Sequence, residues 1–181
     1  KKKGFMAVGM DIDHAFTGDG HFGKDRFGFP VNAKSVADLR EYVAACEGLP
    51  FIVKGVLSVT DALRAAEAGA KGIVLSHHHG SLTFAVPPVM VLPEIRKAVG
   101  DGMTIVVDCG IRDGFDAFKA LALGADGAGI GRGMQPALRE GGKDGVYEYY
   151  AAITDQLRGI MARTGTPSLS VKDPTVIRKV R

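Results

Sequence analysis

The chain has 181 residues, of which 46% are hydrophobic and 24% are charged, so it is long enough to build one sizeable core. Its net charge of +3 comes partly from basic residues at both ends. These basic residues have no interleaved aromatic side chains, which argues against a nucleic-acid-binding surface. No apolar run approaches the roughly 20 residues of a membrane span, and no signal-peptide pattern is present.

Short apolar runs alternate with helical patterns along the chain. The apolar runs predict β-strands over residues 5–11, 51–54, 72–76, 104–108 and 127–131. Apolar residues at helical spacing predict helices over residues 35–46, 60–67, 93–99, 116–123 and 146–164. The strands are almost continuously apolar, which is typical of a parallel sheet that is buried on both faces.

One type of turn occurs twice. Ala68-Gly69-Ala70-Lys71-Gly72 and Leu123-Gly124-Ala125-Asp126-Gly127 each end a helix and begin a strand. Gly124 is expected at the C-terminal cap of its helix, and Ser58 with Asp61 forms an acidic variant of the capping box at a helix start. Repeated strand–helix units indicate an α/β protein, either a (β/α) barrel or a doubly wound sheet.

Polar residues follow the strands and favour the barrel. They fall at the carboxyl ends of successive strands, where the side chains of a barrel converge: Asp11, Lys54, Ser76-His77-His78, Asp108 and Arg132. A dinucleotide-binding sheet would instead gather its glycines in the first strand–helix turn. The predicted strands are too few to close an eight-stranded barrel. We therefore expect residues 1–181 to be the C-terminal portion of one barrel domain in a longer enzyme.

Two glycine-containing motifs predict a phosphate site. Asp108-Cys109-Gly110-Ile111-Arg112 and Gly129-Ile130-Gly131-Arg132 each follow a hydrophobic run and supply glycines and one arginine. Glycines let the backbone approach a ligand closely, and a helix that starts just after them offers free N–H groups to an anion.

Together with other segments, these motifs resemble the FMN-dependent 2-hydroxy-acid oxidases and dehydrogenases, from about Phe5 to Ile177. The pieces that carry the resemblance are Val53-Lys54-Gly55-Val56-Leu57, Asp61-Ala62 through Glu67-Ala68-Gly69-Ala70, Ser76-His77-His78, Leu92-Pro93-Glu94-Ile95, Asp108 to Arg112, Lys119 to Ala125, and Gly131-Arg132. The resemblance implies a (β/α)8 TIM barrel, of which these pieces look like strands 4 to 8. It also implies FMN as cofactor, a small 2-hydroxy acid as substrate and a homo-oligomeric assembly.

The resemblance also implies roles for individual residues. His78 corresponds to the catalytic base, and Lys54 lies beside the N1/O2 edge of the flavin. Asp11 would hold the imidazolium that forms, with Asp13 as the alternative. The residues expected to bind the cofactor are Lys54, Ser76, Asp108, Gly110, Arg112, Gly131 and Arg132. By residue type alone, a lysine such as Lys54 is more often a snorkelling surface residue, and His78 is also compatible with a strand-end histidine that neighbouring groups satisfy.

Metal ligation is not expected. The run His77-His78-His79 consists of consecutive residues, which cannot all face one ion with ordinary geometry. The two cysteines, Cys46 and Cys109, lack metal-ligand spacing and predict a reducing, cytoplasmic compartment.

The chain departs from the family pattern at the substrate side. The arginine that clamps the substrate carboxylate is expected three positions after His78, where this chain has Ser81. A second substrate arginine has no clear counterpart, although Lys24 or Arg26 is available. The usual Asp-Gly-Gly is Asp108-Cys109-Gly110.

Two alternative functions stay open: an FMN-binding barrel with other, isomerase-like chemistry, and a non-catalytic flavin- or phosphate-binding module. The phosphate motifs are also similar to those of type 2 isopentenyl-diphosphate isomerase and IMP dehydrogenase. Lys54 and the Ser76-His77-His78 segment favour the oxidation of hydroxy acids.

Overall fold

A computed structural model of the protein describes residues 4–13, 23–24, 28, 31–78, 80, 84–171 and 173–178. Parallel strands form one five-stranded sheet in the order β1-β2-β3-β4-β5. The strands are β1 (Val8–Asp11), β2 (Phe51–Val56), β3 (Gly72–Leu75), β4 (Thr104–Val107) and β5 (Gly127–Ala128). Each strand pairs with its neighbour in sequence, as in a barrel, whereas a doubly wound sheet reverses its order. The predicted barrel topology is thereby confirmed over this part of the chain.

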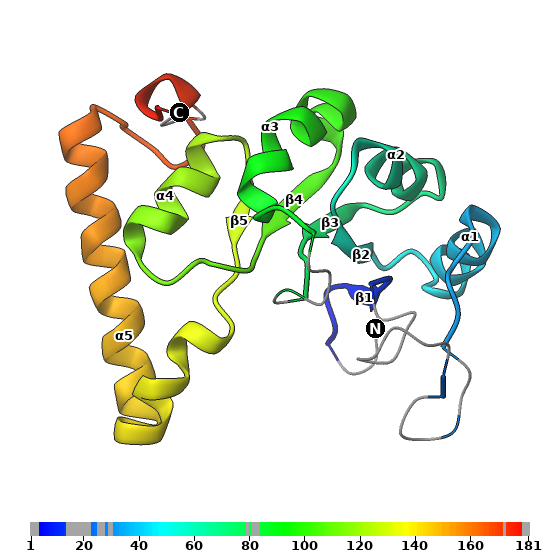
Figure 1. Cartoon of the computed structure of the whole chain (residues 1–181), viewed down its shortest axis with the longest axis horizontal. Helices are drawn as coiled ribbons and strands as arrows, with labels where there is room; N and C mark the ends of the chain where they lie inside the picture. Colours follow the sequence, from blue (N-terminus) through cyan, green and yellow to red (C-terminus); the bar gives the residue numbers. More distant parts are fainter. Residues whose placement is uncertain are drawn as a thin grey trace.

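Helices follow the strands and lie in an arc along one side of the sheet (Figure 1). They are α1 (Val36–Ala45), α2 (Val59–Glu67), α3 (Pro88–Val99), α4 (Gly114–Ala122) and α5 (Gln135–Thr164), with short 3-10 helices η1 (Gly100–Gly102), η2 (Arg132–Met134) and η3 (Pro174–Val176). None of the helices in the described part of the chain is long and apolar enough to cross a membrane.

The main core lies between the sheet and these helices. Alternate strand residues face it and are buried, among them Val53, Ile73 and Ile105. Leu92 and Ile95 of α3 are fully buried in the same cluster. The intervening strand residues point to the other face of the sheet and are only partly buried: Ile52, Val74 and Val106. The sheet therefore carries apolar side chains on both faces, as the continuous apolar strands predicted.

The repeated turn is confirmed in detail. After α2, the N–H of Ala70 donates to the carbonyl of Ala65, and after α4 the N–H of Ala125 donates to the carbonyl of Ala120, both at 3.0 Å. Gly69 and Gly124 have φ values of +92° and +116° in these turns. Both are Schellman motifs, and each delivers the chain into the next strand in the same way.

Some element boundaries differ from the predictions. The last helix was expected to start at 146, but α5 starts at Gln135 and is interrupted at Gly142, where φ is +57°. The third helix starts at Pro88 because Pro88 occupies the first turn, where no N–H is needed, and Pro93 lies within the helix. β5 was expected to reach 131, but only Gly127 and Ala128 pair with β4.

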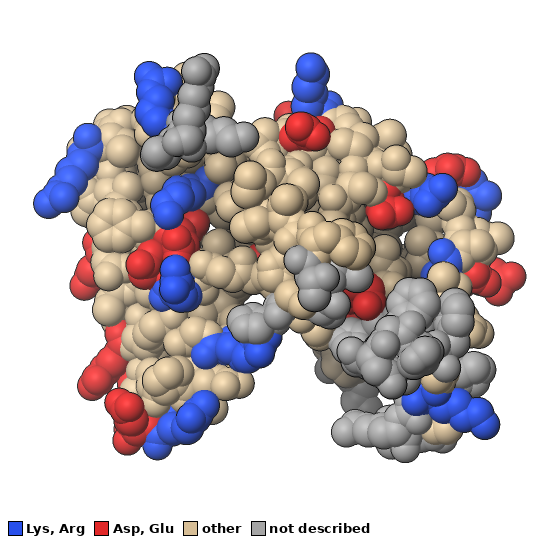
Figure 2. Space-filling view, viewed as in Figure 1, with Lys and Arg blue, Asp and Glu red and all other residues tan. Residues whose placement is uncertain are grey.

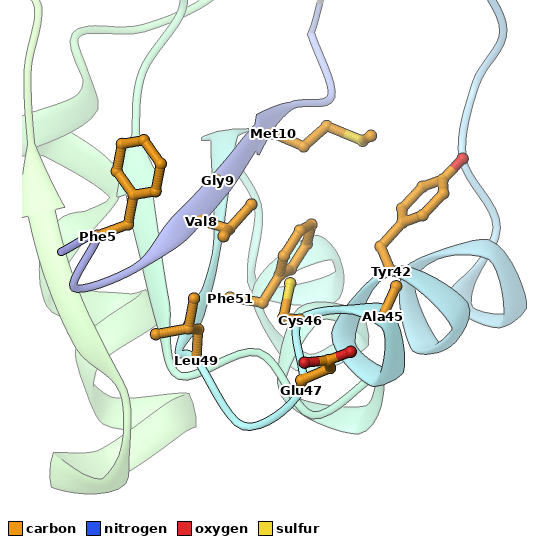
Figure 3. A pocket seen from close by; sticks show the side chains of 10 residues that line it. All are labelled: Phe5, Val8, Gly9, Met10, Tyr42, Ala45, Cys46, Glu47, Leu49 and Phe51. Carbon is orange, nitrogen blue, oxygen red and sulfur yellow. The ribbon is translucent and has the colours of Figure 1, made fainter. Parts of the chain in front are cut away.

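An apolar groove of about 690 Å³ lies along β1 at the edge of the sheet (Figure 3). Its lining comes from the start of the chain, from the end of α1 and from Phe51, and includes Phe5, Val8 and Tyr42. Phe5 is 64% exposed, so this edge of the sheet carries accessible apolar surface against which other protein segments could pack.

Candidate active site

Polar side chains of neighbouring strands meet at the carboxyl end of the sheet. Asp11 is in register with Lys54, and Lys54 with Val74. A cavity of about 490 Å³ opens at this end. It is lined by β2 and by the segments that follow β3, β4 and β5: Lys54, Ser76, His78, Asp108, Cys109, Gly110, Ile111, Arg112, Gly129, Gly131, Arg132 and Gly133. Every residue that we expected to bind the cofactor therefore lines the same cavity.

Four ionisable side chains form one group, which we call the charged cluster: Asp11, Asp13, Lys54 and His78. Lys54 Nζ lies 2.8 Å from Asp11 Oδ1 and 3.2 Å from His78 Nδ1. The same His78 Nδ1 lies 3.3 Å from Asp13 Oδ1. In this cluster the lysine and the histidine lie side by side between the two carboxylates.

The electrostatic environment keeps Lys54 charged. Partial burial is the largest single influence and lowers its pKa, but the hydrogen bond and charge of Asp11, followed by the charges of Asp13 and Asp108, outweigh it. The pKa of Lys54 is therefore raised above its ordinary value. Lys54 therefore places a fixed positive charge near the carboxyl end of β2.

The ammonium group also accounts for the acidic side chains around it. Oxygen and nitrogen atoms of Asp11, Asp13 and His78 lie within 4.8 Å of one another, which is the spacing of a metal site. Lys54 already supplies a cation to this group, 2.8 Å from Asp11 and 3.2 Å from His78. The arrangement is therefore explained by the lysine, and we assign no metal to it.

Asp13 is the most buried carboxylate of the cluster, with 7% of its side chain exposed. It packs directly against Gly55, where a Cβ atom would lie 2.6 Å from Asp13 Cγ. Gly55 has a φ of +94° and sits at an irregularity in the pairing of β2 with β3. Only glycine fits both the conformation and the space. The glycine after Lys54 is visible in the sequence, but the sequence does not show that Asp13 is the residue that packs against it.

The segments after β3 and β4 touch each other at the cavity. Ser76 is fully buried, and its Oγ accepts a hydrogen bond from the backbone N–H of His78 at 3.3 Å and lies 3.5 Å from Cys109 Sγ. His78 and Cys109 have φ values of +47° and +61°, which are uncommon for residues other than glycine. Burial, and then the hydrogen bond with Asp108, raise the pKa of the Cys109 thiol. Cys109 is therefore a neutral thiol at physiological pH.

The two glycine–arginine motifs differ in how they present charge. Arg112 is 78% exposed and lies 3.8 Å from Asp116 Oδ2. The α4 helix that follows it is capped by its own residues, because the N–H of Asp116 donates to Asp113 Oδ1 at 2.9 Å. One N–H of this helix start is therefore satisfied by Asp113, while Gly110 and Arg112 of the motif still line the cavity. After the second motif, Arg132 is exposed and begins η2, and the space beside Gly131 is open within 4 Å.

The predicted substrate-side residues are less well defined. Lys24 is exposed. Arg26, His79 and Ser81 lie outside the described residues. Asp11 was expected to hold the histidine, with Asp13 as the alternative. Asp11 forms its ion pair with Lys54, and Asp13 lies within hydrogen-bonding distance of His78.

Comparison with known proteins places this arrangement in context. The model of the FMN-dependent dehydrogenase family matches residues 5–179. The chain is 44% identical to a 4-hydroxymandelate oxidase of Amycolatopsis orientalis over 130 residues, which cover 71% of this chain and 36% of that protein. It is 36% identical to an L-lactate oxidase of a Nostoc species over 170 residues, which cover 93% of this chain and 46% of that protein.

Solved structures show the same likeness. A mandelate oxidase with benzoyl-formic acid superposes with a TM-score of 0.82 at 32% identity, over 96% of this chain and 55% of that one. A variant of mandelate oxidase with an FMN adduct superposes with a TM-score of 0.81 at 34% identity. The chain thus spans about half of these structures, and less than half of the length of the curated relatives.

Proposed function

Because the chain belongs to the family of FMN-dependent dehydrogenases, we propose that it forms the flavin-binding half of an enzyme that oxidises a small 2-hydroxy acid to the 2-oxo acid. One observation carries this proposal: a single cavity is lined both by Lys54 and His78 and by the glycine–arginine loops after β4 and β5. A proton-accepting group and an anion-binding group thereby face the same space.

The residues of the cavity fit FMN. Its volume of about 490 Å³ falls within the range of cofactor sites. Asp108 Oδ1 is buried without a hydrogen-bond partner among the described residues, so it is ready to accept from a hydroxyl group such as those of the ribityl chain. Arg132 and the open space beside Gly131 suit the phosphate, and Lys54 with Ser76 suits the polar edge of the flavin ring.

The chemistry divides between cofactor and protein. When bound, FMN supplies the acceptor for two electrons. His78 takes the proton from the substrate hydroxyl, while the hydrogen on the substrate carbon leaves with its electron pair and a carbonyl bond forms. Lys54 holds a positive charge beside the site where negative charge develops, and Ser76 fixes the backbone that carries His78.

The rest of the barrel completes the site in this proposal. The apolar groove along β1 is the surface on which the preceding strands and helices of the barrel pack, because an edge strand with apolar side chains requires cover. We further infer a homo-oligomer, as the family resemblance implies. Two free cysteines support a reducing compartment such as the cytoplasm.

Replacement of the base tests the proposal. We expect His78→Gln in the full-length protein to lower the rate of flavin reduction by a 2-hydroxy acid by about 10²- to 10⁴-fold while FMN stays bound. The rate is measured by anaerobic stopped-flow absorbance with lactate, glycolate and mandelate. The neighbouring variant His77→Gln is the matched control and should keep most of the rate.

The outcome separates the alternatives. An unchanged rate in His78→Gln would remove His78 as the base. If a flavin-loaded wild-type protein is reduced by none of these acids, the isomerase-like or non-catalytic interpretation replaces the proposal.

A further inference from the structure

Helix α5 contacts both glycine–arginine motifs through two tyrosine hydroxyls. Tyr149 Oη donates a hydrogen bond to the backbone carbonyl of Arg112, in the loop after β4, at 2.5 Å. The hydroxyl of the next residue, Tyr150, donates to the carbonyl of Ile130, after β5, at 3.4 Å. The two rings meet edge to face, with 5.6 Å between their centroids. One helix thereby holds the backbone of both loops that supply arginines to the cavity.

The hydroxyl of Tyr149 lies where the two loops meet. A Cβ atom at Gly133, in η2, would lie 3.0 Å from this hydroxyl. The same atom would lie 3.3 Å from Ile130 Cγ2 and 3.5 Å from the carbonyl oxygen of Ile111. The hydroxyl therefore packs against η2 while it binds the carbonyl of Arg112, and it joins the loop after β4 to the loop after β5.

The path of α5 explains how its side chains reach back to these loops. Because α5 begins directly after η2, a straight helix would carry Tyr149 roughly 20 Å away from η2. The interruption at Gly142 prevents this: a Cβ atom at Gly145 would collide with the carbonyl of Ala137, although eight residues of straight helix span about 12 Å. The second part of α5 then runs alongside α4 (Figure 1). The interruption thus brings the tyrosines to the loops.

A third contact fixes α5 against the start of α4. Gln156 Oε1 accepts a hydrogen bond from the N–H of Gly114, the first residue of α4, at 2.8 Å. A Cβ atom at Gly114 would lie 2.6 Å from Gln156 Cβ and 2.9 Å from the carbonyl oxygen of Ile153, so the two helices touch at this point. Since α5 is anchored here, the Tyr149 hydroxyl gives the carbonyl of Arg112, two residues before Gly114, a fixed position.

The two tyrosines differ in the strength of their contacts. The Tyr149 distance lies at the short end of the range of about 2.5–3.0 Å for O–H···O hydrogen bonds, and the Tyr150 distance lies beyond that range. Tyr150 is 40% exposed, whereas Tyr149 is half-buried. Burial, followed by electrostatic repulsion from Tyr150 and Asp113, raises the pKa of the Tyr149 phenol. Tyr149 therefore keeps its hydrogen at physiological pH and provides the stronger contact.

We propose that Tyr149 is a positioning residue for the phosphate of FMN: its hydroxyl fixes the loop after β4 against η2 and so sets the separation of the two glycine–arginine motifs. Tyr150 adds a weaker contact to the second motif. Within the described part of the chain, α5 contributes no residue to the cavity lining, so both tyrosines act through the loops. The contact between the loops does not depend on a ligand, whereas the effect on FMN rests on the proposed function.

Fluorescence titrations of the full-length apoprotein with FMN, and with riboflavin, which lacks the phosphate, test this role. In Tyr149→Phe we expect the Kd for FMN to rise by about 3- to 10-fold, because the loss of one hydrogen bond loosens the loops, and the Kd for riboflavin to change by less than about twofold. A variant that only destabilised the fold would weaken both flavins equally. Tyr150→Phe should show a smaller effect. Tyr147→Phe, on the same helix and 76% exposed, is the matched control.

Amide hydrogen exchange of the apoprotein tests the contact between the loops without a ligand. Tyr149→Phe removes one oxygen atom and keeps the ring, so we expect the fold to be retained and strand β3 to keep its exchange rate. Residues 109–114 and 130–134 should exchange at least about threefold faster. The N–H groups of Gly114 and Met134, which donate hydrogen bonds in these segments, report the change.

Three results would overturn the inference: an unchanged Kd for FMN in Tyr149→Phe, an equal rise in the Kd values of both flavins, or unchanged exchange in both segments. If the wild type prefers FMN to riboflavin and Tyr149→Phe keeps that preference, only the inference fails. If the wild type binds neither flavin, the proposed function fails. Faster exchange in Tyr149→Phe, with wild-type exchange in Tyr147→Phe, would in that case still support the contact between the loops.

Discussion

The two sides of the cavity are built in opposite ways. In the charged cluster, every side chain has a polar partner within 3.3 Å, and Asp13 is buried. In the loops after β4 and β5, glycines leave the backbone accessible, Arg132 is exposed, and Asp108 Oδ1 has no partner among the described residues. Hydrogen-bonded ionisable groups fix the positions of their protons, whereas an exposed cation and an acceptor without a partner are available to bind a ligand. The first side is therefore suited to proton transfer and the second to binding.

After the loss of His78, the largest expected effect is on the rate of flavin reduction and concerns the charged cluster. Lys54→Met should slow flavin reduction by about 10²- to 10³-fold, because it removes the fixed positive charge beside the reacting groups. Stopped-flow absorbance measures the rate, and FMN content is checked by its spectrum. The matched control is Lys71→Met, an exposed lysine just before β3. A wild-type rate in Lys54→Met would mean that the charged cluster does not support the chemistry.

Changes in the loops after β4 and β5 should alter the affinity for FMN. Arg132→Ala is expected to raise the Kd for FMN by about 10- to 100-fold, since a charge-assisted hydrogen bond contributes about 1.5–3 kcal/mol. Arg112→Ala should have a smaller effect, because Arg112 is 78% exposed and already lies near Asp116. Flavin fluorescence titration of the apoprotein gives both values, with Arg139→Ala on the exposed surface of α5 as control. Equal Kd values for the wild type and Arg132→Ala would place the phosphate elsewhere.

Backbone strain at Cys109, in the loop after β4, should have a smaller effect, which is on the free energy of unfolding. Cys109 has a φ of +61°, where a side chain costs about 1–2 kcal/mol relative to glycine. Cys109→Gly should therefore be more stable than Cys109→Ala by about 1 kcal/mol, although glycine also gives the unfolded chain more freedom. Denaturant unfolding of both variants measures the difference. If Cys109→Ala were the more stable variant, the strained conformation would be refuted.

The smallest expected effect is a pH dependence of the charged cluster. The folded-state pKa of Lys54 is raised above its ordinary value of 10.5, so its charge contributes to stability in full below that value and loses this contribution as the pH rises through the folded-state pKa. The difference in unfolding free energy between the wild type and Lys54→Met, less than about 1 kcal/mol, should be constant up to about pH 9 and shrink above it. A difference that grows with alkaline pH would contradict the raised pKa.

Much of this architecture could be predicted because strand and helix periods are local properties of the sequence. The continuous apolar strands gave the parallel order, and the repeated Ala-Gly-Ala turns gave two Schellman motifs with the same hydrogen bonds. Polar residues at the strand ends identified the cavity lining, since parallel strands bring their carboxyl ends to one edge.

The remaining features depend on tertiary contacts that periodicity does not encode. The contact of Asp13 with His78 joins residues far apart in the sequence, and Asp13 packs against Gly55 at the irregularity in the pairing of β2 with β3. At the N-terminus of α4, where an anion was expected, the N–H of Asp116 donates to Asp113. A capping aspartate and an anion-binding helix start have similar sequences, and only the side-chain hydrogen bond distinguishes them.

The most direct test of the account is the visible absorption spectrum of the purified full-length protein, recorded anaerobically before and after addition of lactate, glycolate and mandelate. We predict a yellow protein whose flavin absorbance is bleached by at least one of these acids. A yellow protein that none of them bleaches would retain the binding side of the cavity and contradict the oxidation of these 2-hydroxy acids. A colourless protein that does not take up added FMN would contradict the central claim that this cavity holds a flavin.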